Sequence, residues 1–181
     1  MSTAPDTPGP GPVYIFGYGS LMWDPGFAHL ERLPARAHDW HRRFTVMSTT
    51  SWGSADRPGV CAALHPGGTV WGRAFAVDPA ELAGVLAYLD ERERAYLRRR
   101  IRVTMRRGDG LIAGQALTYV ANPAHPRLAA DMPVPERLAR IRHGIGDRGS
   151  SLDYLRNTVA ALRDDGHIRS DAHRILAMVE A

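Results

Sequence analysis

The segment YLRRRIRVTMRR, at residues 96–107, is the feature that most constrains the fold. Its apolar residues alternate with arginines, so that one side carries Leu97, Ile101, Val103 and Met105 and the other carries the arginines at 98, 100, 102 and 106. Alternation with a period of two predicts a β-strand with one buried and one solvated face. The segment GLIAGQALTYV follows through the turn GDG at 108–110 and predicts the partner strand.

Further strands are predicted upstream of this hairpin, and helices downstream. Clusters of Gly, Pro and Ser separate apolar runs, which predicts strands at 13–19, 40–48, 59–65 and 69–77. The last third predicts helices at 134–143, 151–164 and 170–180, with Ser151 and Ser170 as caps and Gly166 as a stop. A strand-rich first part followed by helices indicates an α+β domain.

One helix is predicted between the strands, from the segment DPAELAGVLAYLDERE at 78–93. Asp78 suits the N-cap and Pro79 the first turn. An apolar stripe then follows at helical spacing, made of Leu82, Val85, Leu86 and Leu89. The helix ends in LDERERAY, where Asp90, Glu91 and Glu93 oppose the helix dipole. A salt-bridged helix end and a functional carboxylate both account for this cluster.

The composition excludes several classes of protein. All 23 basic residues are arginine, which excludes a Schiff-base lysine and a Walker-type phosphate loop. The single cysteine, Cys61, excludes an internal disulfide and a CxxC site. No apolar run reaches the roughly 20 residues of a membrane span. The first 12 residues resemble no secretory signal and predict a disordered tail, residues 1–12, before one domain at 13–181, with a cytoplasmic location expected.

Several other candidate sites have simpler interpretations. The arginine face of 98–107 lacks interleaved aromatic residues, so a solvated strand face is favoured over a nucleic-acid site. His38 and His41 have no third metal ligand nearby and are predicted to be surface residues, so no metal site is expected. Ser20 lacks the GxSxG context of a nucleophile. Cys61 lies in an apolar stretch and is predicted to pack in the core.

The loop FGYGSL, after the first predicted strand, places two glycines within three positions. A tight turn explains it, and so does a nest of backbone N–H groups that binds an anion or a developing oxyanion. The glycines at 17 and 19 would let a ligand approach the backbone closely.

Taken together, these segments resemble the ChaC-type γ-glutamylcyclotransferases, which degrade glutathione. The resemblance runs from YIFGYGSLMWDPGF through WHRRFTVMSTT, RPGVCAALHPGGTVWGRAFAV, YLDERE, ALTYVANPAHPRLAADMP and GSSLDYL, and so covers residue 13 to about 180. It implies a compact α+β domain with a small central β-barrel and flanking helices. It also implies a catalytic Glu93 and a substrate-binding set made of Gly17, Tyr18, Gly19, Ser20, Leu21, Met22 and Tyr154.

The implied reaction explains why no cofactor is expected. The α-amine of a γ-glutamyl peptide attacks its own γ-carbonyl, closes 5-oxoproline and expels the next residue, so the substrate supplies the nucleophile. Glutathione is the expected substrate, and Glu93 the expected proton shuttle. Two alternatives remain open: a cyclotransferase for another γ-glutamyl compound, since TSWGSAD replaces the His-Arg-Gly-Thr stretch common in the family, and a non-catalytic module that binds an anion.

Overall fold

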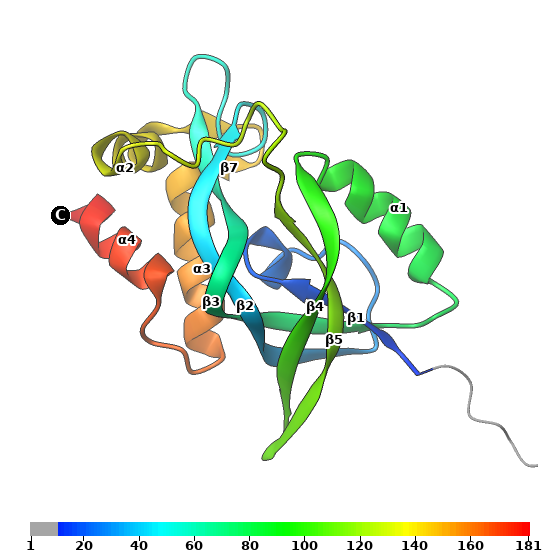
Figure 1. Ribbon diagram of the computed structural model, residues 1–181. Helices are drawn as coiled ribbons and strands as arrows, with labels where there is room; N and C mark the ends of the chain where they lie inside the picture. Colours follow the sequence, from blue (N-terminus) through cyan, green and yellow to red (C-terminus); the bar gives the residue numbers. More distant parts are fainter. Residues whose placement is uncertain (1–10) are drawn as a thin grey trace, which may run out of the picture.

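The structure is a computed structural model that describes residues 11–181. Within this range five strands close into a barrel in the order β1-β3-β2-β4-β5 (Figure 1). They are β1 (Val13–Gly17), β2 (Glu31–Ser48), β3 (Gly59–Val77), β4 (Tyr96–Arg107) and β5 (Gly110–Ala121). The tail predicted for residues 1–12 lies, apart from its last two residues, outside the described range.

The barrel is mixed because its first strand joins two strands in opposite senses. β1 pairs antiparallel with β3, with Val13 opposite Val77, and parallel with β5, with Tyr14 opposite Ala116. The remaining pairs, β2–β3, β2–β4 and β4–β5, are antiparallel. The predicted α+β class with a small central barrel is confirmed.

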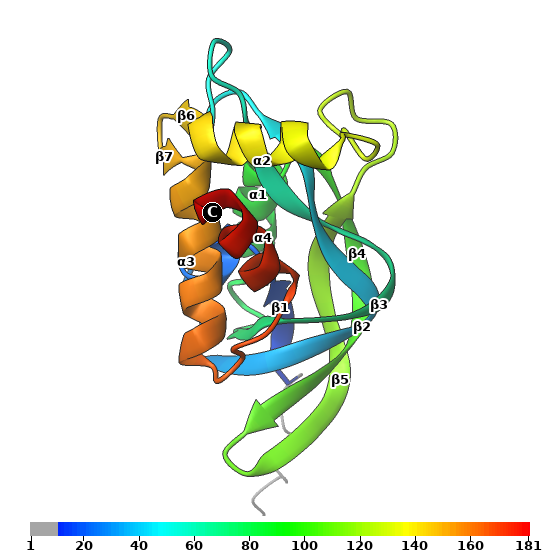
Figure 2. The ribbon, with the colours of Figure 1, turned by 90° about the vertical axis from the view of Figure 1, so that its left-hand side faces the viewer.

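Helices cover the barrel on two sides. α1 (Leu82–Arg92) packs alone on one side, over a buried cluster that includes Ile15, Val77 and Leu89. Figures 1 and 2 show the three C-terminal helices together on the other side. These are α2 (Val134–His143), α3 (Ser151–Asp164) and α4 (Asp171–Glu180), with the short ribbon β6 (Ile145–Gly146) and β7 (Gly149–Ser150) between the first two. None of the described helices has the length and apolar character needed to cross a bilayer.

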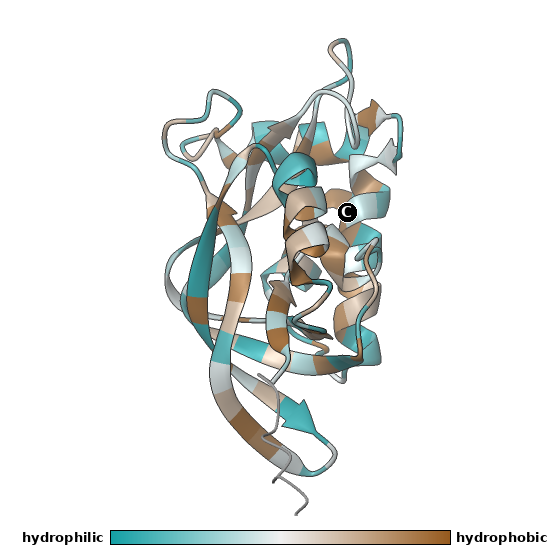
Figure 3. Ribbon diagram, turned by 90° about the vertical axis from the view of Figure 1, so that its right-hand side faces the viewer, coloured by the Kyte–Doolittle hydropathy of each residue, from teal (hydrophilic) through white to brown (hydrophobic). Residues whose placement is uncertain are grey.

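The β4–β5 hairpin has the faces that the alternating pattern predicts. Ile101, Val103 and Met105 are buried, while the predicted arginine face, made of Arg98, Arg100, Arg102 and Arg106, is exposed. Hydrophilic and hydrophobic residues alternate along the long strands in Figure 3. The register is continuous from Tyr96 opposite Ala121 to Arg107 opposite Gly110, so a tight turn joins the two strands.

Two predicted strand boundaries are wrong. The strands predicted at 59–65 and 69–77 form one strand, β3, because Pro66 and the glycines at 67 and 68 bend the chain while its pairing with β2 continues on both sides. β2 begins at Glu31 rather than near 40, and its pairing with β3 tolerates Pro34.

Two predicted helix caps are also wrong. Asp78 accepts a hydrogen bond from the Ala80 N–H at 2.9 Å and forms a turn, so α1 begins only at Leu82, after Glu81. Ser150 caps α3 in place of Ser151, through a capping box with Asp153. The Ser151 hydroxyl instead donates to the Val60 carbonyl and accepts from the Val60 N–H, which ties α3 to β3. Ser170 caps α4 as predicted, and Gly166 follows the end of α3 with a positive φ of 85°.

Candidate active site

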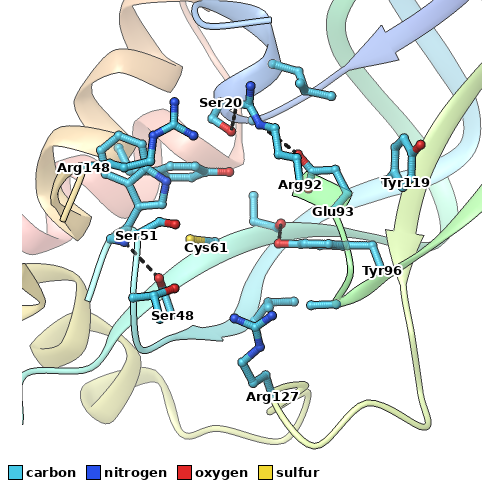
Figure 4. Close-up of a pocket in the computed structure, with 18 of the residues that line it drawn as sticks. Ser20, Ser48, Ser51, Cys61, Arg92, Glu93, Tyr96, Tyr119, Arg127 and Arg148 are labelled. Carbon is cyan, nitrogen blue, oxygen red and sulfur yellow. Dashed lines mark hydrogen bonds and ion pairs between the residues drawn. The ribbon is translucent and has the colours of Figure 1, made fainter. Parts of the chain in front are cut away.

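A pocket opens where β1, α1, the β2–β3 region and α3 converge (Figure 4). The strands β4 and β5 and the loop that follows β5 also contribute to its wall. The lining residues that carry functional groups are Ser20, Ser48, Thr50, Ser51, Trp52, Cys61, Glu93, Tyr18, Tyr96, Tyr119, Tyr154, Arg92, Arg127 and Arg148. Because they come from positions 18 to 154, the pocket exists only when the whole domain is folded.

The turn after β1 brings backbone N–H groups to the pocket. Ser20–Met22 form a single 3-10 turn, with Gly19 as its N-cap. The Met22 N–H donates to the Gly19 carbonyl at 2.9 Å, so the amides just before it, at Ser20 and Leu21, need partners outside the turn. Gly19, Ser20 and Leu21 all line the pocket. Amides at the start of a helical turn favour an anionic group.

Both glycines of this turn are required by close approaches. A β-carbon at position 17 would lie 2.8 Å from the Leu21 β-carbon, and one at position 19 would lie 2.1 Å from the Tyr154 hydroxyl. Tyr154 lies on α3 and is 4% exposed. The backbone of the turn at Gly19 therefore packs directly against the Tyr154 side chain of α3, and the phenol lies at the pocket wall.

Glu93 lies at the end of α1 and its carboxylate faces into the pocket. Its N–H donates to the Leu89 carbonyl at 2.8 Å, so it ends the apolar stripe of the helix. The side chain is only 15% exposed, whereas that of Glu91 is 72% exposed and pairs with Arg94 at 3.3 Å. Positions two residues apart on a helix differ by about 200° of rotation, which predicts that Glu93 continues the inward apolar stripe and that Glu91 faces solvent, and the exposures confirm this contrast. Loss of hydration raises the pKa of the Glu93 carboxyl above its ordinary 4.5, and Arg92 and Arg148 oppose that shift.

Arg92 connects Glu93 to the β1 turn. Its Nε lies 3.3 Å from Glu93 Oε1, and its Nη2 donates to the Ser20 hydroxyl at 3.1 Å. Its Nη1 donates to the carbonyls of Asp24 and Pro25 and to the Tyr88 hydroxyl. Because Ser20 Oγ accepts from Arg92, its own proton is free to point toward another acceptor.

Buried hydroxyl and thiol groups make up the rest of the pocket. The Tyr18 hydroxyl donates to the Tyr119 carbonyl at 2.7 Å, and the Tyr96 hydroxyl donates to the Ala62 carbonyl at 3.0 Å. Burial raises the pKa of Tyr18, Tyr96 and Tyr154, so all three remain protonated donors at neutral pH. Burial also raises the pKa of the Cys61 thiol to about 12. That thiol is neutral, in keeping with the predicted buried Cys61, although it also borders the pocket.

The pocket brings together six of the eight residues predicted for the site: Tyr18, Gly19, Ser20, Leu21, Glu93 and Tyr154. Gly17 and Met22 are predicted substrate contacts that do not reach its wall. Gly17 packs against Leu21, and Met22 is 1% exposed, with its carbonyl accepting from Arg73 Nη1 at 2.8 Å. Both support the turn from behind.

Sequence reasoning missed the three arginines, the Ser48–Trp52 segment and the tyrosines of β4 and β5. A signal existed only for Arg92, which stands beside Glu93 in the same motif. His38 contacts Thr104 and His41 contacts the Gly67 carbonyl, which explains both without a metal. Residues 11–181 contain no group of three or more His, Cys, Asp or Glu side chains that could hold one.

Comparison with known proteins identifies similar chains. A family model described as ChaC-like protein matches residues 13–181. The glutathione-specific gamma-glutamylcyclotransferase of Escherichia coli (strain K12) is 32% identical over 151 residues, which cover 82% of this chain and 64% of that protein. The glutathione-specific gamma-glutamylcyclotransferase 1 of Danio rerio is 30% identical over 178 residues, covering 92% of this chain and 90% of that one. The chain thus spans less than two thirds of the length of the bacterial relative.

A solved structure has the same fold. The crystal structure of the yeast γ-glutamyl cyclotransferase specific to glutathione superposes with a TM-score of 0.83. The match covers 94% of this chain and 95% of the yeast chain, at 21% sequence identity. At that identity the similarity establishes the barrel and its flanking helices and does not establish the chemistry of the pocket.

Proposed function

The chain belongs to the ChaC-like protein family, and we propose that it is a γ-glutamylcyclotransferase that cleaves glutathione to 5-oxoproline and Cys-Gly. The observation that carries this proposal is the pairing, in one pocket, of a largely buried carboxylate with the start of a helical turn. Glu93 supplies the carboxylate, and Ser20 and Leu21 supply the amides. Proton transfer and oxyanion stabilisation are the two kinds of assistance that this reaction needs.

The reaction begins with the α-amine of the glutamyl residue. An α-ammonium group has a pKa of about 8 and is mostly protonated at neutral pH, so it must lose a proton before it can attack. Glu93 accepts that proton when its carboxylate is ionised. The freed lone pair then bonds to the γ-carbonyl carbon of the same residue and closes a five-membered ring.

The tetrahedral intermediate carries an oxyanion, and it collapses when the C–N bond to the next residue breaks. The leaving nitrogen needs a proton, and Glu93 delivers the one that it took from the amine. The raised pKa of Glu93 suits it to both steps, because it narrows the difference between the pKa of the carboxyl and that of the amine. Glu93 then accepts the proton more readily than an ordinary carboxylate does, and it can still give the proton up. A single residue can therefore act first as base and then as acid.

The substrate presents two anionic groups to the loop, its α-carboxylate and the oxyanion. The amides at Ser20 and Leu21 and the free proton of the Ser20 hydroxyl are the donors near Glu93. Tyr154 adds a protonated phenol at the same wall. Gly17 and Met22 hold the turn in shape. The proposed reaction uses no metal and no cofactor. We propose that it takes place in the cytoplasm, where glutathione keeps thiols such as that of Cys61 reduced.

The direct test is to incubate the purified protein with glutathione and to identify the products by mass. Release of 5-oxoproline together with Cys-Gly supports the proposal, whereas release of free glutamate indicates hydrolysis. A panel of other γ-glutamyl donors, including γ-glutamylamines, tests the substrate. If a γ-glutamylamine is turned over and glutathione is not, the cyclotransfer stands and the assignment of glutathione is wrong.

A further inference from the structure

Three arginines line the pocket, and their partners differ. Arg92 donates to four oxygen atoms and lies against Glu93. Arg148 pairs with Asp24, and its guanidinium lies 5.9 Å from the centre of the Trp52 ring. Arg127 has a half-buried side chain at the pocket wall, and within residues 11–181 no carboxylate or carbonyl is bound to its guanidinium. Its charge is available to a ligand.

The backbone of Arg127 is held in place although its side chain is free. The Arg127 N–H donates to His125 Nδ1 at 3.2 Å, and its carbonyl accepts from the Met47 N–H at 2.8 Å. The next residue, Leu128, forms a β-bridge with Val46 of β2. The loop between β5 and α2 is therefore attached to the barrel at the point where it presents the guanidinium to the pocket.

Arg127 lies away from the catalytic end of the pocket. In Figure 4, Glu93 and Arg92 lie on one side of the Tyr96 ring and Arg127 on the other, with its guanidinium directed into the pocket. The electrostatic pattern agrees, since Arg92 and Arg148 are the arginines that lower the pKa of Glu93, whereas Arg127 acts on the Cys61 thiol. The glutamyl α-carboxylate is one bond from the carbon that bears the α-amine, so it stays at the Glu93 end of the pocket, on the other side of the Tyr96 ring from Arg127.

We infer that Arg127 binds the C-terminal carboxylate of the leaving peptide and so selects γ-glutamyl peptides over γ-glutamylamines, an inference that rests on the proposed function. An extended leaving dipeptide carries its carboxylate about 7 Å beyond the γ-carbonyl, on the side of the pocket away from the β1 turn. A guanidinium that is half-buried and has no internal partner can bind a carboxylate through two parallel hydrogen bonds. The turn and Arg127 would then hold the two ends of one substrate.

The first experiment compares glutathione with its C-terminal amide, in which the same peptide lacks the charge. For the wild-type protein we expect the amide to have a kcat/KM about 10- to 100-fold lower, mainly through KM, as for loss of a charge-assisted hydrogen bond. Arg127→Met should lower kcat/KM for glutathione by the same factor and leave the value for the amide nearly unchanged. Arg100→Met removes the same charge from an exposed site on β4 and should affect neither substrate.

Equal losses for both substrates in Arg127→Met would overturn the inference, because they would indicate a role in holding the loop. Calorimetric binding of the two ligands to Glu93→Gln, with and without Arg127→Met, provides a test that needs no turnover. We expect Arg127→Met to weaken binding of glutathione and not of the amide. If the Glu93→Gln protein that keeps Arg127 bound the two ligands with equal affinity, the inference would be overturned. A protein that binds with this preference but releases no 5-oxoproline would contradict the proposed function alone.

Discussion

The Tyr154 hydroxyl occupies the place beside Gly19 where a side chain would begin, 2.1 Å from the ideal position of a β-carbon there. Two segments that are 135 positions apart in the chain thus meet at the wall of the pocket. The next ring atom of Tyr154, Cζ, lies 3.2 Å from the same position. The oxygen atom is therefore the main obstruction, and it can be removed while the ring, whose Cζ makes a smaller close contact, is kept.

This contact predicts that Gly19→Ala will be rescued by a second substitution. Alone, Gly19→Ala should lower the free energy of unfolding by about 1–3 kcal/mol, the usual cost of overpacking, and should reduce turnover. Adding Tyr154→Phe removes the clashing oxygen and should restore most of the stability. Gly84→Ala is the control, since no atom lies within 4 Å of its β-carbon, and it should stabilise helix α1. Denaturant unfolding of these proteins and of Tyr154→Phe alone measures the coupling, and purely additive effects of the two substitutions would contradict the prediction.

The two carboxylates at the end of α1 should differ sharply in their effect on turnover. Glu93→Gln keeps the size of the side chain and removes the base, so turnover should fall by at least about 10²-fold, the low end for acid–base catalysis. Glu91→Gln should leave turnover within a small factor of wild type, because Glu91 is exposed and pairs only with Arg94. Steady-state release of 5-oxoproline decides between them. An inactive, folded Glu91→Gln protein would move the base to Glu91.

Glu93→Gln should also become more stable than the wild type as the pH rises. Burial raises the pKa of Glu93 in the folded protein above 4.5, so between its unfolded and folded pKa values the folded state binds more protons. The wild type therefore loses stability as the pH rises through this window, whereas the glutamine variant does not. Urea unfolding at pH 4 and pH 8 should give a larger advantage for the variant at pH 8. If the difference in unfolding free energy between the two proteins did not change with pH, Glu93 would have the same pKa in the folded and unfolded states, which would contradict this prediction.

The pH dependence of kcat/KM should respond to the pocket arginines in a graded way. Glu93 must be ionised to accept a proton, so activity rises with pH on an acidic limb whose midpoint lies above 4.5. Arg92 lowers the pKa of Glu93 more than Arg148 does. Arg92→Gln should therefore move the acidic limb to higher pH, and Arg148→Gln should move it less. A limb that stays in place in Arg92→Gln would assign it to another group.

Acetylation of the substrate tests the identity of the nucleophile. N-acetylglutathione keeps the γ-glutamyl bond and the thiol but has no basic α-amine, so it should not release Cys-Gly. We expect it to bind as an inhibitor, since the rest of the molecule is unchanged. Detection of Cys-Gly by mass makes the comparison with glutathione direct, and turnover at a comparable rate would indicate that water or a side chain attacks the γ-carbonyl.

The sequence predicts those parts of the fold that depend on local periodicity. The β4–β5 hairpin follows from the alternation of apolar residues with arginines, and the C-terminal helices lie at the predicted positions. Glu93 and Glu91 are distinguished by about 200° of helical rotation, which the structure bears out as a difference in exposure. Local pattern fails at β3, where glycines that usually end a strand only bend one that stays paired with β2.

The residues that long-range packing brings to the pocket could not be predicted in this way. Arg127 lies in a loop of irregular structure. Its position is set by two contacts with β2: the Met47 N–H donates to the Arg127 carbonyl, and Leu128 forms a β-bridge with Val46. The helix cap lies at Ser150, one residue before the predicted Ser151, because the Ser151 hydroxyl forms hydrogen bonds with the backbone of Val60 in β3. In both cases the residue that makes the contact is distant in the sequence, so the local sequence pattern does not indicate it.

The parallel pairing of β1 with β5 has a consequence for synthesis on the ribosome. β1 is the earliest described strand to be translated, yet both of its neighbours come later, β3 ending at Val77 and β5 at Ala121. Until β5 has left the exit tunnel the barrel stays open at this edge, and the apolar strand at 13–17 can pair on one side only, with β3. The turn that carries Gly19 and Ser20 is attached to that strand, so the nascent chain acquires its binding surface only at a late stage of translation.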